Sequence, residues 1–90
     1  MVTMPLEDFI EEVKSEIIGY EELGEEKALE WEQKFLSLVN SEGRSIPQIE
    51  VKNGKKFYRL EDESEIFKIV DMYLAAVDSG EEEEYWKKWD

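Results

Sequence analysis

The sequence contains no histidine and no cysteine, and these two absences remove many of the side chains that proteins use for catalysis and metal binding. Without cysteine there is no disulfide, no thiolate zinc site and no thiol redox chemistry. Without histidine, general acid–base catalysis falls to carboxylates, lysine or tyrosine. We therefore expect a protein that is not an enzyme and holds no cofactor, and the lack of cysteine fits a reducing cytoplasm.

Long apolar runs are also missing. No segment approaches the ~20 consecutive apolar residues that cross a bilayer. The opening residues, Met1 to Pro5, lack the basic and apolar stretches of a signal peptide. With only 2 prolines and 5 isolated glycines, the chain has no linker and no phosphate-binding loop. We expect residues 1–90 to form a single small domain.

Basic residues are few, because 11 Lys and Arg face 24 Asp and Glu, and the formal net charge is −13. Hydrophobic residues still make up 41% of the chain and aromatic residues 12%, which is more than a disordered acidic chain carries. A folded acidic domain is repelled by anionic lipid and by nucleic acid. The composition therefore favours a basic protein partner and argues against membranes and nucleic acid.

Apolar residues recur at helical spacing in three segments. The first runs from about Pro5 to Tyr20, with Thr3 or Met4 as its cap, and the second from about Glu25 to Asn40. The third, from about Glu63 to Val77, is the most apolar. Its apolar residues cover more than one stripe, so we expect this helix at the centre of the core.

Between the second and third helices the apolar period changes to two. Asn53-Gly54 separates two alternating runs, and this pair is typical of a type I′ turn because both residues adopt positive φ. The pattern predicts a two-stranded hairpin at about residues 48–60. Val51 would lie opposite Lys56, and Phe57 would lie on the wetter face. The predicted core face consists of Ile49, Val51, Tyr58 and Leu60.

The final ten residues begin with four glutamates and carry two lysines near the end, a charge order that suits a short helix. Tyr85, Trp86 and Trp89 would cluster on one side of it. They form either a lid that closes the core, which we favour in so short a chain, or an anchor for a partner. The fold class is therefore α+β, with three main helices, a short C-terminal helix and the hairpin.

The charge is segregated along the chain. Residues 1–43 hold 12 acids and 3 bases, a net of −9, and residues 61–90 hold 11 acids and 3 bases, a net of −8. Residues 44–60 hold 1 acid and 5 bases, a net of +4. Lysines on exposed strands prevent edge-to-edge pairing, so the basic hairpin has a structural explanation. It could also contact phosphate, an acidic partner, or an acidic helix of a second copy, which would make a homodimer.

We predict a non-enzymatic, acidic interaction or regulatory domain that binds a basic partner, or that inhibits a nucleic-acid-binding protein by mimicry. One alternative is nucleic-acid contact through the basic hairpin at residues 52–59. Another is a Ca²⁺ or Mg²⁺ site at residues 61–65 or 78–84, although neither cluster has EF-hand spacing. The candidate partner-binding residues lie on the hairpin and the tail: Lys52, Lys55, Lys56, Phe57, Arg59, Tyr85, Trp86 and Trp89.

Overall fold

The computed structural model describes residues 1–43 and 45–89, so Arg44 of the basic segment and Asp90 of the tail lie outside it. The helices and strands of this part are, in chain order, β1 (Val2–Pro5), α1 (Leu6–Ile18), α2 (Gly24–Val39), β2 (Ile49–Lys52), β3 (Lys55–Leu60), α3 (Glu65–Ser79), α4 (Glu82–Trp86) and the 3₁₀ helix η1 (Lys87–Trp89). The predicted α+β class is confirmed. The three main helices begin and end within two residues of their predicted bounds.

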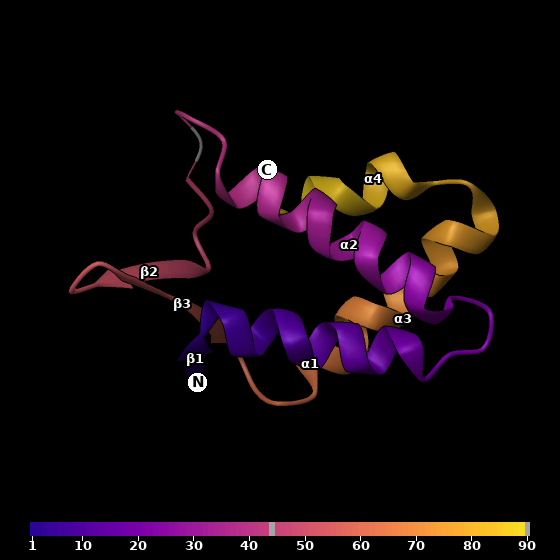
Figure 1. The fold of residues 1–90 in the computed structure, drawn as a ribbon, viewed down its shortest axis with the longest axis horizontal. Helices are drawn as coiled ribbons and strands as arrows, with labels where there is room; N and C mark the ends of the chain where they lie inside the picture. Colours follow the sequence, from indigo (N-terminus) through magenta and orange to yellow (C-terminus); the bar gives the residue numbers. More distant parts are fainter. Residues whose placement is uncertain (44, 90) are drawn as a thin grey trace.

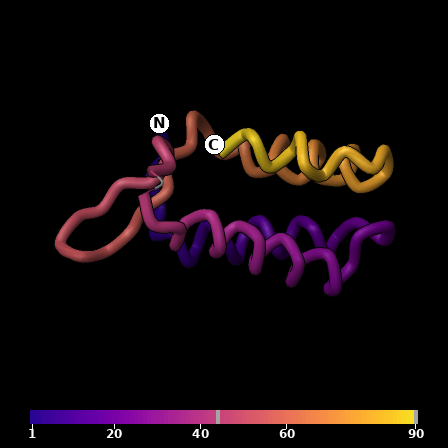
Figure 2. Tube along the Cα trace, turned by 90° about the horizontal axis from the view of Figure 1, so that it is seen from above, coloured from indigo at the N-terminus to yellow at the C-terminus, as the bar shows by residue number. Residues whose placement is uncertain are grey.

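The helices form two layers beside a small sheet. Helices α1 and α2 lie side by side in one layer, and α3 and α4 form the other, as seen from above in Figure 2. The sheet lies at one end of these layers, and the β2–β3 hairpin projects from that end (Figure 1). The hairpin therefore has helices behind its base and none beside its tip.

The sheet has three antiparallel strands in the order β1-β3-β2, which corrects the prediction of two. Thr3 and Met4, the predicted caps, lie in β1, and the residue that precedes the first turn of α1 is Pro5; Val2 at the start of β1 lies opposite Leu60. A two-stranded hairpin alone is marginal in water, and β1 completes a sheet large enough to pack on α1. Four residues that end in Pro5 are too few for their alternation to be read from the sequence.

The predicted register of the hairpin is confirmed, with Val51 opposite Lys56. Asn53 and Gly54 have φ angles of 51° and 77°, as a type I′ turn requires. The prediction of a buried Val51 is wrong, because this side chain is 63% exposed. It belongs to the core face by alternation, but it lies in the projecting half of the hairpin. Tyr58, nearer the helices, is fully buried.

Helix α1, rather than α3, occupies the central position. It contacts α2, α3, β1 and β3, whereas α3 packs mainly on α1 and α4. Two of the large apolar side chains of α3, Phe67 and Met72, are 53% and 51% exposed. The high apolar content of α3 thus reflects an exposed apolar surface as well as a buried one.

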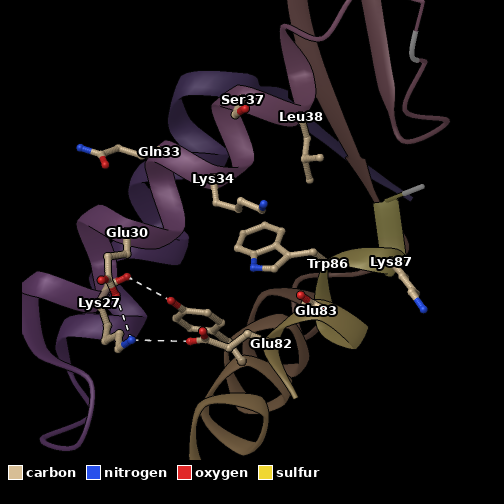
Figure 3. Close-up of a pocket in the computed structure, with 11 residues that line it drawn as sticks. Lys27, Glu30, Gln33, Lys34, Ser37, Leu38, Glu82, Glu83, Trp86 and Lys87 are labelled. Atoms are coloured by element: carbon tan, nitrogen blue, oxygen red, sulfur yellow. Dashed lines mark hydrogen bonds and ion pairs between the residues drawn. The ribbon is translucent and has the colours of Figure 1, made fainter. Parts of the chain in front are cut away.

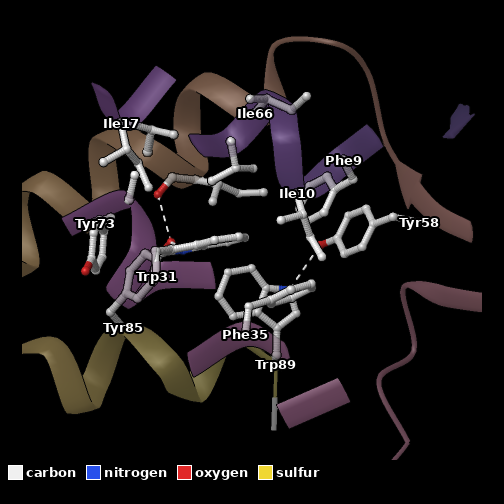
Figure 4. Close-up of a cluster of buried hydrophobic side chains, with 14 of the residues drawn as sticks. Phe9, Ile10, Ile17, Trp31, Phe35, Tyr58, Ile66, Tyr73, Tyr85 and Trp89 are labelled. Carbon is white, nitrogen blue, oxygen red and sulfur yellow. Dashed lines mark hydrogen bonds between the residues drawn. The ribbon is translucent and has the colours of Figure 1, made fainter. Parts of the chain in front are cut away.

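Aromatic rings fill the interior between the two helix layers (Figure 4). Phe9 of α1 stacks on Tyr58 of β3, with ring centroids 3.7 Å apart. Trp31 stacks on Phe35 within α2 at 4.9 Å. The Trp89 ring meets Phe35 edge-on at 5.3 Å. Such contacts join α1, α2, β3 and the tail in one cluster and add to the energy of area burial.

The polar atoms of this cluster are hydrogen-bonded to one another. The Trp31 Nε1–H donates to the Tyr85 hydroxyl at 2.9 Å, and that hydroxyl donates to the Ile69 carbonyl at 3.1 Å. The Trp89 Nε1–H donates to the Tyr58 hydroxyl at 3.0 Å. Tyr85 and Trp89 are 5% and 0% exposed, so the tail forms the closing face of the core.

The Trp89→Ala variant should be strongly destabilised. Removing a buried tryptophan costs about 3–5 kcal/mol, a large share of the roughly 5–15 kcal/mol of a typical domain. Trp86→Ala, on the same short tail but at a half-buried position, is the matched control and should cost clearly less. Urea unfolding followed by far-ultraviolet circular dichroism measures both. Equal losses would contradict the role of the tail in closing the core.

Alkaline pH should unfold the protein, because every tyrosine has a raised pKa. Burial raises the pKa of Tyr58 and Tyr73 to about 12 and also raises that of Tyr85. The hydrogen bond that the Tyr20 hydroxyl donates to Asp71 raises the pKa of Tyr20. The stabilisation is complete below about pH 10, the pKa in the unfolded chain, and is lost as the pH rises through the folded values.

A pH titration that follows tyrosinate absorbance and circular dichroism together tests this expectation. The tyrosinate signal should rise steeply and coincide with loss of helical signal. A gradual rise centred on about pH 10 with the fold intact would contradict it.

Candidate interaction surfaces

The outer half of the hairpin, residues 51–56, is a projecting basic surface that we call the basic finger. All six residues are exposed, and the finger contains Lys52, Lys55 and Lys56 but no acid. Lys52 lies directly opposite Lys55 in the sheet, a like-charge arrangement that opposes hairpin formation. In the part of the chain that the structure describes, none of the three lysines forms an ion pair.

The other two predicted hairpin residues are engaged within the sheet region. The Arg59 Nη2–H donates to the Pro47 carbonyl at 2.6 Å, and its Nε lies 3.5 Å from Glu50 Oε1. Arg59 therefore ties the segment before β2 to the central strand. Phe57 is half-buried on the outer face of β3, opposite Glu50 in β2. Within the described part of the hairpin, the basic residues without an ion pair are therefore the three lysines of the finger.

Of the three predicted tail residues, two are buried and one is half-buried. Tyr85 and Trp89 are interior, and neither presents a surface for a partner while the tail is docked. Trp86 is half-buried and lines a groove of about 840 Å³ between α2 and α4 (Figure 3). Lys27 crosses this groove, because its Nζ lies 2.9 Å from Glu30 Oε2 and 3.5 Å from Glu82 Oε1. The charges of this α2–α4 groove balance one another and tie the two helices together.

A second groove, of about 580 Å³, lies between α1 and α3 next to β1, and we call it the acidic groove. Its side chains come from segments more than 40 residues apart in the sequence. Glutamates form its rim, and a methionine, an isoleucine and a phenylalanine form its apolar part. The lining residues, which include no lysine or arginine, are Met4, Glu11, Glu12, Ser15, Glu16, Glu63, Ile66 and Phe67.

Most of the negative charge of the acidic groove is uncompensated. Lys14 lies 3.4 Å from Glu11 but closer, at 3.0 Å, to Glu32 of α2. The hydrogen bond to Glu32 raises the pKa of Lys14 and keeps it charged. The other rim glutamates have no basic partner within the described residues: Glu12, Glu16 and Glu63.

The acidic groove is not among the sequence-predicted sites. On the sequence, its glutamates fit the solvated side of a helix, and Phe67 fits the apolar side of α3. The signal that could have found the groove is the excess of apolar residues on the third helix, which is more than one buried face can accommodate. Only the packing of α1 on α3 brings the exposed phenylalanine beside the glutamates.

Two of the carboxylates in the predicted metal-binding cluster at residues 61–65 are engaged in hydrogen bonds. Within the described residues, no group of three or more acids is placed to hold a metal ion. The hydroxyl and the backbone N–H of Ser64 donate to Asp62, which holds the pKa of Asp62 below its usual value. Glu65 accepts a hydrogen bond at 2.9 Å from the Glu61 N–H. Among the helices described, none has the length and apolar character needed to cross a membrane.

Neutralising Arg59 and Lys56 should have different effects on stability. Arg59→Gln removes a charged hydrogen bond and should cost about 1.5–3 kcal/mol. Lys56→Gln, the matched control, removes the same charge from an exposed side chain and should change stability by less than about 0.5 kcal/mol. Urea midpoints at constant m-value report both. Equal effects would show that Arg59 is as free as the lysines of the finger.

Comparisons with known proteins identify no relative of this chain. No family model matches it, and neither the curated proteins nor the solved structures include a significant match. The function of the chain therefore has to be inferred from its own charges, buried contacts and surfaces.

Proposed function

We propose that this chain is a non-enzymatic interaction domain whose acidic groove binds a basic, amphipathic segment of a partner protein. One observation carries the proposal. The groove combines a rim of four glutamates, without a lysine or arginine in its lining, with the 53% exposed side chain of Phe67. Uncompensated charge and exposed apolar surface are both unfavourable in a free protein, and a basic amphipathic partner relieves both.

The chemistry of the partner follows from the two parts of the groove. An amphipathic helix presents apolar residues at i, i+3, i+4 and i+7 and can carry basic residues on either side of them. Its apolar residues would contact Met4, Ile66 and Phe67, and its lysines or arginines would face the rim. Methionine adapts to different apolar shapes, and the charges accelerate the encounter.

The non-enzymatic part of the proposal rests on the available side chains. Histidine and cysteine are missing from the sequence. All four tyrosines have raised pKa values, so none of them is activated as a base near neutral pH. Carboxylates and lysines are present, but the lining of the acidic groove includes no lysine or arginine, and the nearest one, Lys14, lies closer to Glu32 than to Glu11.

The alternative functions predicted from the sequence would require other features of the surface. A nucleic-acid mimic acts through carboxylates alone, so the exposed Phe67 would have no part in it. Nucleic-acid contact through the hairpin would rely on three lysines, because Arg59 already bonds to Pro47 and Glu50. A Ca²⁺ or Mg²⁺ site would need carboxylates that converge. The combination found in the acidic groove favours a basic protein segment.

A fluorescently labelled helix of leucine and lysine, with its leucine–glutamate analogue as charge control, tests the proposal. Anisotropy should show that only the lysine peptide binds, and the Kd should rise as salt increases. Phe67→Ser should weaken binding about tenfold, and the E12Q/E16Q double variant should weaken it several-fold. Both alter exposed or half-exposed side chains, so the fold should persist.

A matched double variant separates a specific site from a general charge effect. E25Q/E26Q removes the same charge from exposed acids in the first turn of α2, outside the acidic groove. It should leave the Kd nearly unchanged. Failure of the lysine peptide to bind, or equal weakening by both double variants, would overturn the proposal. An effect of E12Q/E16Q without one of Phe67→Ser would favour charge mimicry instead.

A further inference from the structure

The basic finger combines a concentration of lysines with an exposed apolar side chain. Three lysines lie within five residues at the tip of a hairpin, and two of them face each other across the strands. Beside them Val51 is 63% exposed. Lysine on an edge strand prevents edge pairing, but this role does not account for the exposed apolar side chain beside the lysines. The combination points to a contact.

We propose that the partner of the basic finger is a second copy of this chain, whose acidic groove receives it. The inference rests on the proposed function, because it names one occupant of the same groove. The finger and the groove have opposite charges, and each has an exposed apolar side chain, Val51 in the finger and Phe67 in the groove. Within the described residues, neither the three lysines of the finger nor three of the four groove glutamates form an ion pair. The fourth glutamate, Glu11, pairs with Lys14.

The chemical match is close. Val51 and Lys56 lie on one face of the hairpin and Lys52 and Lys55 on the other. A finger inserted into the groove would therefore present lysines to the glutamates on both of its sides, and Val51 would lie against the apolar part that includes Phe67. A hairpin with a two-residue turn is narrow, because neighbouring strands lie only about 4.7–4.9 Å apart. The finger projects from the end of the helix layers, which leaves its tip accessible to a second molecule (Figure 1).

Two-fold symmetry would make this contact reciprocal. If the two copies are related by a two-fold axis, each finger enters the groove of the other copy and the contact is made twice. An arrangement without that symmetry would add copies end to end. Two contacts of opposite charge at short range then act against the repulsion between two molecules of net charge −13. That repulsion is largely screened beyond about 8 Å at physiological salt.

Nucleic acid is the competing occupant of the finger. It would use the three lysines but leave Val51 exposed, and the acidic helices behind the finger would repel its remaining phosphates. A second copy uses both the lysines and the valine, and this favours self-association.

An exchange of charge between two variants tests the inference. K55E/K56E reverses the finger and E12K/E16K reverses the groove, so the variants carry net charges of −17 and −9. Each variant alone should associate at least about tenfold more weakly than the wild type in sedimentation equilibrium. An equimolar mixture restores opposite charges at both contacts and has the same total charge as two wild-type copies. It should associate within about threefold of the wild-type Kd.

A third variant separates the effect of the groove from the effect of net charge. E25K/E26K carries the same charge as the groove variant but leaves the groove and the finger intact, so on its own it should associate about as tightly as the wild type, whereas E12K/E16K should not. Circular dichroism and urea midpoints establish that all variants fold. A mixture that fails to associate where the wild type does would place the interface elsewhere and overturn the inference.

The self-association inference and the proposed function can fail separately. A wild-type chain that remains monomeric at high concentration overturns the self-association, while binding of the lysine peptide would still support the groove. If the monomeric wild type also binds a single-stranded oligonucleotide at low salt, and K55E/K56E does not, the finger is a nucleic-acid contact instead. If neither the peptide nor a second copy binds, both proposals are wrong.

Discussion

The structure depends on the insertion of two tail side chains, Tyr85 and Trp89, into the space between the helix layers. Their hydrogen bonds reach Trp31 of α2, Ile69 of α3 and Tyr58 of β3, so one short segment joins three parts of the chain. A chain of 90 residues buries a smaller fraction of its surface than a larger protein does. Large aromatic residues with satisfied polar atoms are an effective way to fill such a core.

This core has to hold together a strongly charged molecule. A net charge of −13 on a small body favours expansion through self-repulsion. Two ion pairs link helices across the acidic surface: Lys14 pairs with Glu32, and Lys27 pairs with Glu82. Much of the remaining negative charge lies on exposed helix faces, and the finger carries three exposed lysines without an acid among its residues. Both proposals depend on this separation of charge.

The elements whose physics is local could be predicted from the sequence. The helices follow from apolar spacing, and the turn follows from Asn53-Gly54, where both residues need positive φ. Strand β1 could not be predicted, because its four residues are specified by pairing with β3, which lies more than 50 positions away. Val51 alternates correctly yet is exposed. Alternation assigns a side chain to a face of the sheet, but the neighbouring helices decide whether that face is covered there.

The candidate surfaces also depend partly on the sequence alone and partly on tertiary packing. By itself the sequence determined the sign of the charge, its separation into acidic helices and a basic hairpin, and the lack of histidine and cysteine. Tertiary structure decided which residues meet. It engaged Arg59, Tyr85 and Trp89 in internal contacts and left the finger lysines free. It also formed the acidic groove from β1, α1 and α3, because the packing of one helix on another is a long-range property that no local pattern encodes.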